Sequence, residues 1–154
     1  MTIAKAAVIG AGVMGSGIAA QIANAGVPVV LLDIVPKGAT NRNAIAEGAV
    51  AKLLKSDPAA FMHPKNARLV TTGNLEDDIA LLKDCDWIVE AVLEKLEVKH
   101  ATYEKIDKAR KAGSIVSSNT STIPLKDLIG GLPEASVHAS HLAMDALNAA
   151  IKNR

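Results

Sequence analysis

The feature that most constrains this sequence is a glycine-rich turn between an apolar strand and a helix. A short apolar run ends at Gly10, and from Val13 onward small and aliphatic residues recur with helical spacing. The turn between them reads Gly10-x-Gly12-x-x-Gly15. In this context Gly10 permits a sharp turn, Gly12 lets the backbone approach a diphosphate, and Gly15 lets the helix pack closely on the strand. The pattern therefore predicts a dinucleotide-binding turn.

The helix start and the end of the next strand supply the other groups that such a ligand needs. The helix N-terminus presents free amide N–H groups, including those of Val13 and Met14, and about half a positive charge. Asp33 ends the next apolar run, where a carboxylate accepts hydrogen bonds from both hydroxyls of an adenosine ribose. It would oppose a 2′-phosphate by roughly 4 kcal/mol per unit charge at 4 Å in a surface-like dielectric. We therefore expect NAD rather than NADP; the alternative is an ordinary tight turn beside a solvated aspartate, with no ligand.

Short apolar runs continue to alternate with amphipathic stretches along the rest of the chain. We expect further strands at residues 27–32, 68–71, 87–92, 114–118 and 136–139. We expect helices at residues 43–55, 77–83, 96–112, 124–129 and 142–151, and a loop at 57–66. This alternation predicts an α/β fold, a doubly wound and mostly parallel sheet of the Rossmann type. The 154 residues carry no internal repeat, which favours a single domain over residues 1–154.

Composition narrows the possible partners. Seventeen basic residues face sixteen acidic ones, and one Trp, one Tyr and one Phe are all that could stack on bases, so nucleic-acid binding is disfavoured. No apolar run reaches membrane-spanning length. The single cysteine, Cys85, cannot form an internal disulfide, and His138 and His141 offer two metal ligands without a third. We expect a cytoplasmic protein with no metal, no nucleic-acid partner and no membrane contact.

Three segments, in this order, resemble the NAD-binding domain of 3-hydroxyacyl-CoA dehydrogenases: residues 8–15 (VIGAGVMG), 87–94 (WIVEAVLE) and 117–121 (SSNTS). The likeness extends over about residues 3–135, and the long insert before residue 87 looks like the bacterial multifunctional type, in which this domain belongs to a longer chain. The resemblance implies oxidation of an L-3-hydroxyacyl-CoA to the 3-ketoacyl-CoA, with hydride transfer to NAD, which is the β-oxidation step.

The same resemblance assigns roles to residues at matching positions. It implies that Ala91, Glu94 and Lys99 lie along the cofactor and that Ser121 hydrogen-bonds the substrate oxygen near the nicotinamide. Asn119 would shape the loop at the strand end. All of these residues follow expected strands, and ligands of open α/β sheets bind beyond the carboxyl ends of the strands. The competing interpretations are a solvated helix start for Glu94 and Lys99 and a helix cap for Ser121.

Beyond residue 135 the likeness to the family breaks down. Family members continue into a His-Phe-Phe-Asn-Pro segment, whose histidine is the catalytic base, and then reach a glutamate that orients it. Residues 136–145 here read SVHASHLAMD, so His141 is the best stand-in for the base, with Asp145 one helical turn away. An apolar stripe over residues 142–151 predicts a divergent helical tail that packs on the sheet or mediates a homodimer.

Three functions stay open on these grounds. The first is the NAD-binding domain of a 3-hydroxyacyl-CoA dehydrogenase, with little or no turnover unless a substrate domain is supplied to bind the acyl-CoA. The second is a stand-alone NAD-binding module without catalysis. The third is a small dehydrogenase that uses Ser121 and His141 on another hydroxy substrate.

Overall fold

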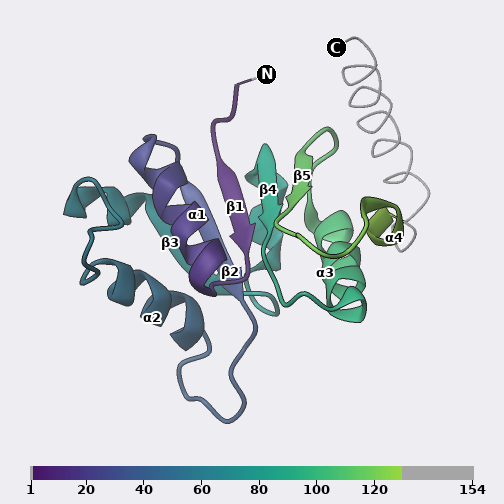
Figure 1. The fold of residues 1–154 in the computed structure, drawn as a ribbon, viewed down its shortest axis with the longest axis horizontal. Coiled ribbons are helices and arrows are strands. Elements are labelled where there is room, and N and C mark those ends of the chain that lie inside the picture. Colours follow the sequence, from purple (N-terminus) through teal and green to yellow (C-terminus); the bar gives the residue numbers. More distant parts are fainter. Residues whose placement is uncertain (1, 130–154) are drawn as a thin grey trace.

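Five parallel strands form one twisted sheet at the centre of the molecule (Figure 1), in a computed structural model that describes residues 2–129. The strands are β1 (Ala6–Ile9), β2 (Val29–Asp33), β3 (Val70–Asn74), β4 (Trp87–Glu90) and β5 (Ile115–Ser118). Their order across the sheet is β3-β2-β1-β4-β5, and every neighbouring pair is parallel. The chain thus starts in the middle, builds one side of the sheet, and then returns to build the other. This arrangement confirms the doubly wound, parallel Rossmann-type fold.

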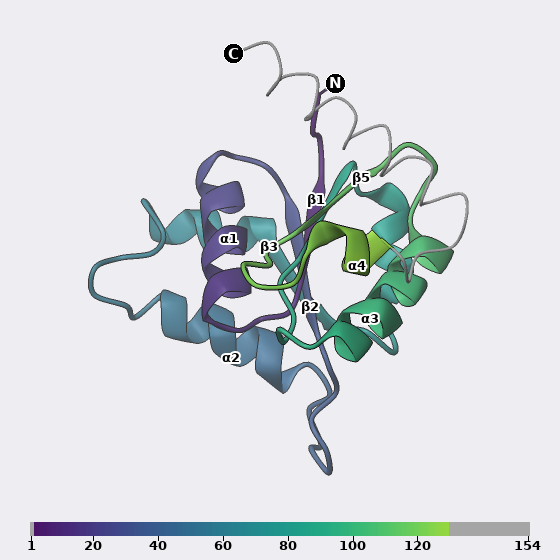
Figure 2. The same ribbon diagram turned by 45° about the vertical axis from the view of Figure 1, so that its right-hand side comes forward.

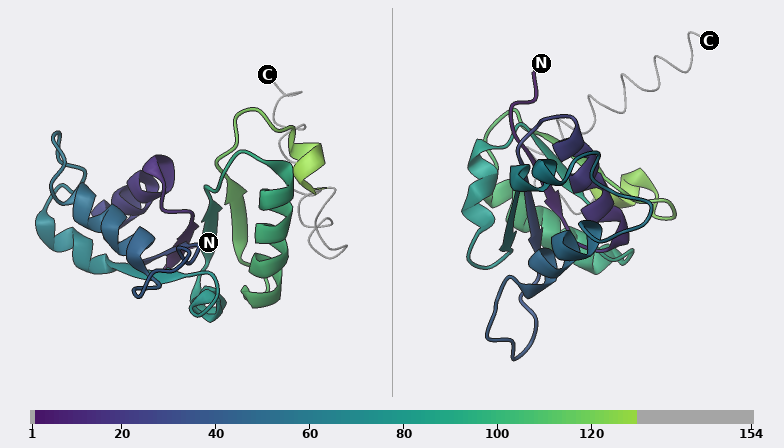
Figure 3. Two further views of the ribbon diagram at one scale, coloured as in Figure 1. Left: turned by 90° about the horizontal axis from the view of Figure 1, so that it is seen from below. Right: turned by 90° about the vertical axis from the view of Figure 1, so that its left-hand side faces the viewer.

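Helices cover both faces of the sheet (Figures 2 and 3). On one face lie α1 (Val13–Asn24) and α2 (Ala44–Leu53), with the short 3-10 helix η1 (Pro64–Leu69) packed near α1. On the other face lie η2 (Ile79–Asp84), α3 (Leu96–Ala109) and the short α4 (Leu125–Ile129). The connections within each half of the sheet therefore stay on one face, as right-handed crossovers require.

The alternation of side chains along β1 divides the core into two layers. Ala6 and Val8 pack toward α1 and α2, while Ala7 and Ile9 pack toward η2 and α3, and all four are fully buried. A strand covered on both faces needs apolar residues at every position, which is why the first run of the sequence shows no polar alternation. Each fully buried Ile or Leu in these layers contributes roughly 1.5–3 kcal/mol of hydrophobic stabilisation.

Several element boundaries differ from the sequence-based expectations for local reasons. Strand β2 begins at Val29 instead of residue 27, because Pro28 has no N–H to donate to a sheet. Strand β3 begins at Val70 instead of residue 68, because Arg68 and Leu69 complete η1, a 3-10 helix that begins within the expected loop at 57–66. Helix α3 stops at Ala109, since Arg110 adopts an extended conformation (ψ 154°). The expected strand at 136–139 and helix at 142–151 lie outside the described residues.

The strand order brings the carboxyl ends of β1, β2 and β4 together at one edge of the sheet. Strand β1 pairs with β2 on one side and with β4 on the other, so that Ile9 lies between Leu32 and Glu90. This is the point where the strand order reverses, and ligands of open α/β sheets bind at such a point beyond the carboxyl ends of the strands, a region termed the crevice. Among residues 2–129, no helix is long and apolar enough to cross a membrane.

Candidate functional site

The turn after β1 requires glycine at two of its three glycine positions. Gly10 has φ +103°, and a Cβ atom there would lie 2.5 Å from the carbonyl oxygen of Ala91. A Cβ atom on Gly15 would lie 1.8 Å from the Gly10 carbonyl oxygen and 3.3 Å from the Ala91 Cβ. Ala91 is held in this position because its N–H donates to the Ile9 carbonyl at 2.8 Å. The first turn of α1 is therefore in direct contact with the ends of both β1 and β4.

Gly12 differs from its two neighbours because it faces open space. It has φ −65°, and a Cβ atom added there would have no atom within 4 Å. It is the N-cap residue of α1, yet no side chain in the described part of the chain caps this helix, and its first turn carries no acidic residue. The start of α1, with the amide N–H groups of Val13 and Met14, thus borders open space. A diphosphate fits such a cradle, because it needs N–H donors and room close to the backbone.

Asp33 lies beside this cradle and is fixed to it. Its Oδ2 atom accepts a hydrogen bond from the Ala11 N–H at 2.5 Å, and its Oδ1 atom accepts one from the Ile34 N–H at 2.6 Å. A carboxylate has about four acceptor positions, so both oxygens keep capacity for the hydroxyls of a ribose. The side chain is half-buried and ends β2, one strand away from the glycine turn.

The first arginine after Asp33 in the sequence, Arg42, is held by acidic side chains. The guanidinium of Arg42 donates to Asp77 at 2.6 Å and to Glu76 at 2.9 Å. These two carboxylates raise the pKa of Arg42, and Arg42 in turn lowers the pKa of Asp77. The side of the crevice next to β2 and β3 therefore presents Asp33 and an arginine that is already paired.

On the opposite side of the crevice, the Glu94 carboxylate accepts hydrogen bonds from the loop at residues 120–122. Its Oε1 atom accepts hydrogen bonds from the Thr120 hydroxyl, from the Ser121 N–H at 3.1 Å, and from the Thr122 N–H and hydroxyl at 3.2 and 3.1 Å. These donors, with the Thr120 hydroxyl foremost, hold the pKa of Glu94 well below its usual range. The side chain remains 33% exposed, so an ionised carboxylate borders the solvent here.

Lys99 lies below this carboxylate in a fully buried position. Its Nζ atom is 2.8 Å from Glu90 Oε1 and 3.2 Å from Glu94 Oε2, and neither Lys99 nor Glu90 has any exposed surface. Glu90 also accepts hydrogen bonds from the hydroxyls of Tyr103 at 2.8 Å and Ser118 at 2.6 Å. Burial raises the pKa of Tyr103, and the Glu90 carboxylate adds to this shift, so the phenol stays a neutral donor.

Most of the predicted site residues lie at the edge of the sheet formed by the carboxyl ends of the strands, and one of them, His141, lies outside the described residues. Asn119 follows β5, with its N–H donating to the Glu90 carbonyl at 2.7 Å and its side chain exposed. Ser121 is exposed two residues later, next to Glu94. Lys99 is beneath the surface, not along it. His141 lies outside the described residues, so its assignment stays a prediction.

Sequence reasoning missed the buried network around Glu90. Glu90, Tyr103 and Ser118 were not among the expected site residues, although Glu90 stands inside the apolar run WIVEAV. A charged residue in a strand covered on both faces is rarely tolerated without a partner. The sequence could therefore have indicated that Glu90 has a buried partner. Its partners come from α3 and β5, which sequence spacing does not reveal.

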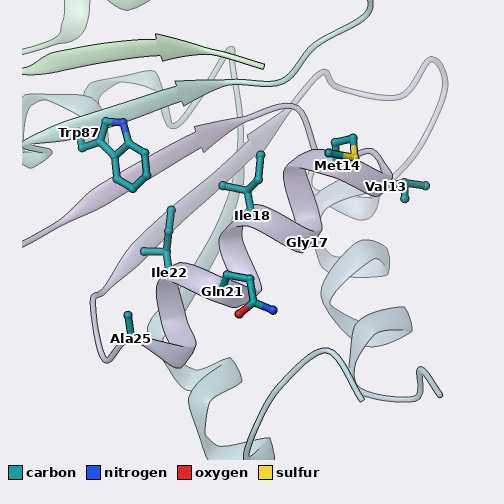
Figure 4. A pocket seen from close by; sticks show the side chains of 8 residues that line it. All are labelled: Val13, Met14, Gly17, Ile18, Gln21, Ile22, Ala25 and Trp87. Carbon is teal, nitrogen blue, oxygen red and sulfur yellow. The ribbon is translucent and has the colours of Figure 1, made fainter. Parts of the chain in front are cut away.

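An apolar groove between α1 and Trp87 of β4 is a separate feature (Figure 4). It is lined by Val13, Met14, Gly17, Ile18, Gln21, Ile22, Ala25 and Trp87. The Trp87 indole N–H is directed to the Ser117 hydroxyl at 2.9 Å, which leaves an almost entirely apolar lining. Such a surface does not suit a charged diphosphate, and the cradle at Gly12 does. Within residues 2–129, no group of three or more His, Cys, Asp and Glu side chains could hold a metal ion.

Comparison with known proteins gives consistent matches. A family model described as "3-hydroxyacyl-CoA dehydrogenase, NAD binding domain" matches residues 5–145. A probable 3-hydroxyacyl-CoA dehydrogenase of Deinococcus radiodurans is 55% identical over 134 residues, covering 87% of this chain and 39% of the relative. A putative fatty acid oxidation complex trifunctional enzyme of Rickettsia felis is 48% identical over 132 residues, covering 86% of this chain and 18% of the relative.

A solved structure agrees with these sequence relatives. The (S)-3-hydroxybutyryl-CoA dehydrogenase of Ralstonia eutropha superimposes with a TM-score of 0.65 and 26% identity, over 87% of this chain and 47% of that one. The chain thus spans less than half of the length of each of these relatives.

Proposed function

Because the chain belongs to the 3-hydroxyacyl-CoA dehydrogenase family, as its NAD-binding domain, we propose that it binds NAD across the β1–β4 crevice and selects it over NADP. The diphosphate would rest on the amides at the start of α1. The adenosine ribose would donate hydrogen bonds to Asp33, and the second ribose would lie toward Glu94. This orientation follows from the strand order, since β2 and β4 flank the turn on opposite sides.

The observation that carries this proposal is the contrast among the three glycines. Gly10 and Gly15 are crowded by backbone atoms, whereas a Cβ atom added to Gly12 would meet no atom within 4 Å. Packing within the domain explains why Gly10 and Gly15 are glycine, but it does not explain glycine at position 12. A ligand that comes close to the backbone at Gly12 supplies the missing reason.

The preference for NAD rests on charge. An ionised Asp33 would repel a 2′-phosphate, and Arg42, the arginine on the following loop, is paired with Glu76 and Asp77. The Asp33 carboxylate also accepts hydrogen bonds from the Ala11 and Ile34 N–H groups, which hold it beside the turn. Both observations support discrimination against NADP.

The activity proposed for the whole protein is oxidation of an L-3-hydroxyacyl-CoA to the 3-ketoacyl-CoA in fatty acid β-oxidation. Bound NAD would supply the hydride acceptor. Ser121, exposed beside Glu94, would hydrogen-bond the substrate oxygen, and His141 is the proposed base. Because the relatives are much longer, we propose that binding of the acyl-CoA requires a substrate domain. A free, buried Cys85 supports placement in the reducing cytoplasm.

Calorimetric titration with NAD and NADP tests the cofactor assignment. We expect the chain to bind NAD and the variant Gly12→Val to lose binding, because the new side chain occupies the cradle. Gly17→Val is the matched control: it lies on the same helix, also has open space around it, and lines the apolar groove instead. Equal NAD affinity in wild type and Gly12→Val, or no NAD binding by wild type, would contradict the proposal.

The oxidation proposal has its own test. NADH consumption with acetoacetyl-CoA is measured for this chain and for the same chain mixed with the substrate domain of a relative. Turnover only in the mixture supports the need for that domain, and turnover by the chain alone that His141→Ala abolishes would instead support the small-dehydrogenase alternative.

A further inference from the structure

The proposed function does not use the apolar groove between α1 and Trp87. The groove has a volume of about 560 Å³, and besides the Trp87 indole the polar side chain in its lining is that of Gln21. Figure 4 shows Ile18 and Ile22 on the side of α1 that faces Trp87. Val13, at the start of the helix, is 84% exposed. Contiguous apolar side chains of this kind mark a surface that another element covers.

The apolar surface continues from the groove onto the edge strand of the described sheet. Trp87 on β4 pairs with Ile115 on β5, so the two side chains lie side by side on the same face of the sheet. On this face α1 and α2 lie over β1, β2 and β3, whereas α3 lies on the opposite face. Ile115 is 46% exposed. The β5 end of this face is therefore left partly open within residues 2–129.

The shape of the groove suits an apolar helix. Its lining on α1 runs from Val13 to Ala25, which is about 18 Å at 1.5 Å per residue. The small residues Gly17 and Ala25 leave gaps beside the larger Ile18 and Ile22. Helices pack by fitting the side chains of one into the gaps of the other, so an occupant needs both small and branched residues along one face. That face must also be uncharged, because the lining contains no ionised partner.

A segment of the same chain meets these requirements. The apolar residues at positions 142, 143, 146, 147, 150 and 151 fall on one face of the helix that the sequence predicts there. They are three alanines, two leucines and one isoleucine, and Asp145 falls on the other side. A helix over residues 142–151 is about 15 Å long, close to the length of the groove. This segment lies outside the described residues, and its pattern comes from the sequence alone.

The connection between the described residues and this segment is long enough to reach the groove. Ile129 ends α4, which packs beside α3 on the opposite face of the sheet. Residues 130–141 can extend over at most roughly 40 Å, which exceeds the roughly 30 Å diameter of a small domain. The chain can therefore pass around β5, the edge strand of the described sheet, and return over the α1 face.

We propose that residues 142–151 of this chain dock as a helix in the groove between α1 and Trp87 and cover Ile115 beside it. The segment would complete the helical layer on the α1 face, over the part that α1 and α2 leave open. The inference uses no property of NAD binding, so it stands or fails independently of the proposed function.

Trp87 reports on this docking, because it is the only tryptophan of the chain. A charge on the apolar face should expel the segment, since the groove has no partner for that charge. We expect Leu147→Asp to shift the emission of Trp87 to longer wavelength and to increase its quenching by acrylamide. Asn148→Asp adds the same charge on the other side of the predicted helix, and we expect it to leave both signals at their wild-type values. Wild-type emission and quenching in Leu147→Asp would overturn the inference.

Cys85 distinguishes undocking from unfolding of the whole domain. It is buried in the core layer on the opposite face of the sheet. We expect a thiol reagent to leave Cys85 unmodified in Leu147→Asp while the Trp87 signal changes. Gln21→Glu introduces a charge from the groove side, at an exposed position of α1, and should shift the Trp87 emission in the same direction. A wild-type signal in the folded Gln21→Glu variant would contradict the inference.

Cross-linking identifies whose segment occupies the groove. Gln21→Cys/Ala146→Cys places one thiol in the groove lining and one in the middle of the apolar face, and a short bismaleimide joins thiols that lie close together. We expect a cross-link within one chain, and its loss when Leu147→Asp is added. The control Glu104→Cys/Ala146→Cys has one thiol at an exposed position of α3, on the opposite face, and should give no cross-link.

The other occupants of the groove give different results in the same experiment. Cross-links found only between two chains, or shielding of Trp87 that appears only as the protein concentration rises, would assign the groove to a second copy. Equal cross-linking of the Gln21 and Glu104 pairs would show that the segment has no defined site. Either result overturns the inference.

Discussion

The carboxylate of Asp33 accepts a 2.5 Å hydrogen bond from the backbone N–H of Ala11, which joins the end of β2 to the turn that follows β1. The residue proposed to recognise the adenosine ribose therefore also holds the diphosphate cradle in shape. Its removal should affect two parts of the ligand at once.

We predict that Asp33→Ala weakens NAD and also reduces discrimination against NADP, each by at least about tenfold, because it removes both the ribose acceptor and the repulsion of a 2′-phosphate. Calorimetric titration with both dinucleotides measures the two effects. Asp33→Asn is the matched control, since it keeps the size of the side chain and loses the charge. Unchanged discrimination in Asp33→Ala would show that this residue does not face the ribose.

Gly15 should tolerate no side chain. A Cβ atom there would lie 1.8 Å from the Gly10 carbonyl oxygen, so Gly15→Ala forces α1 away from β1 and should cost about 1–3 kcal/mol of unfolding free energy or more. Urea unfolding followed by circular dichroism measures this cost. Gly48→Ala, in the open middle of α2, should instead stabilise the domain by about 0.5–1 kcal/mol. Equal effects of the two substitutions would contradict the close contact of α1 with β1.

Asp86 should contribute to the acid stability of the domain. It accepts hydrogen bonds from Lys111 at 2.5 Å and from the N–H groups of Ala4 and Lys5, and these lower its pKa to about 2. A pKa below the unfolded value means that the stabilisation is present above about pH 4 and is lost as the pH falls toward 2.

Asp86→Asn should therefore flatten the decline of the melting temperature between about pH 4 and 2. Asp57→Asn, in the loop before η1, is the control for loss of one carboxylate. The same slope in wild type and Asp86→Asn would contradict the assigned pKa.

Cys85 should be unreactive in the folded chain. The thiol is fully buried, its Sγ atom lies 3.6 Å from the Ala6 carbonyl oxygen, and burial raises its pKa. We expect no reaction with a thiol reagent at neutral pH and complete reaction in denaturant, because only the thiolate is nucleophilic. The rate of labelling at low denaturant would then report opening of the core layer on the α3 face. Rapid labelling of the native chain would refute this description.

Local patterns in the sequence were enough to predict the first half of the fold and of the site. The turn at Gly10 to Gly15 lies between two adjacent elements, and Asp33 ends the strand that follows, so spacing along the chain places them together. The unit from β1 to β2 appears where it was expected. Strand β2 begins at Val29, two residues later than expected, because Pro28 has no N–H to donate to the sheet.

The second half depends on contacts that spacing does not specify. Glu90, Lys99 and Ser118 lie on three different elements, and only the packing of α3 against β4 and β5 brings them together. Helical periodicity identified α3 but gave no reason to bury its lysine, because a lysine at a helix start is usually solvated. The partner that makes burial possible is visible only once the strands are arranged in space.

The central place of β1 has a practical consequence for redesign. The residues proposed to contact the adenosine side lie within β1, α1, β2 and the positions just after them, while those proposed for the opposite side lie within residues 90–122. On this proposal, separate stretches of the gene encode the recognition of the two ends of a dinucleotide. Library mutagenesis of the first stretch alone should then change the cofactor preference and leave the residues proposed for the chemistry unchanged.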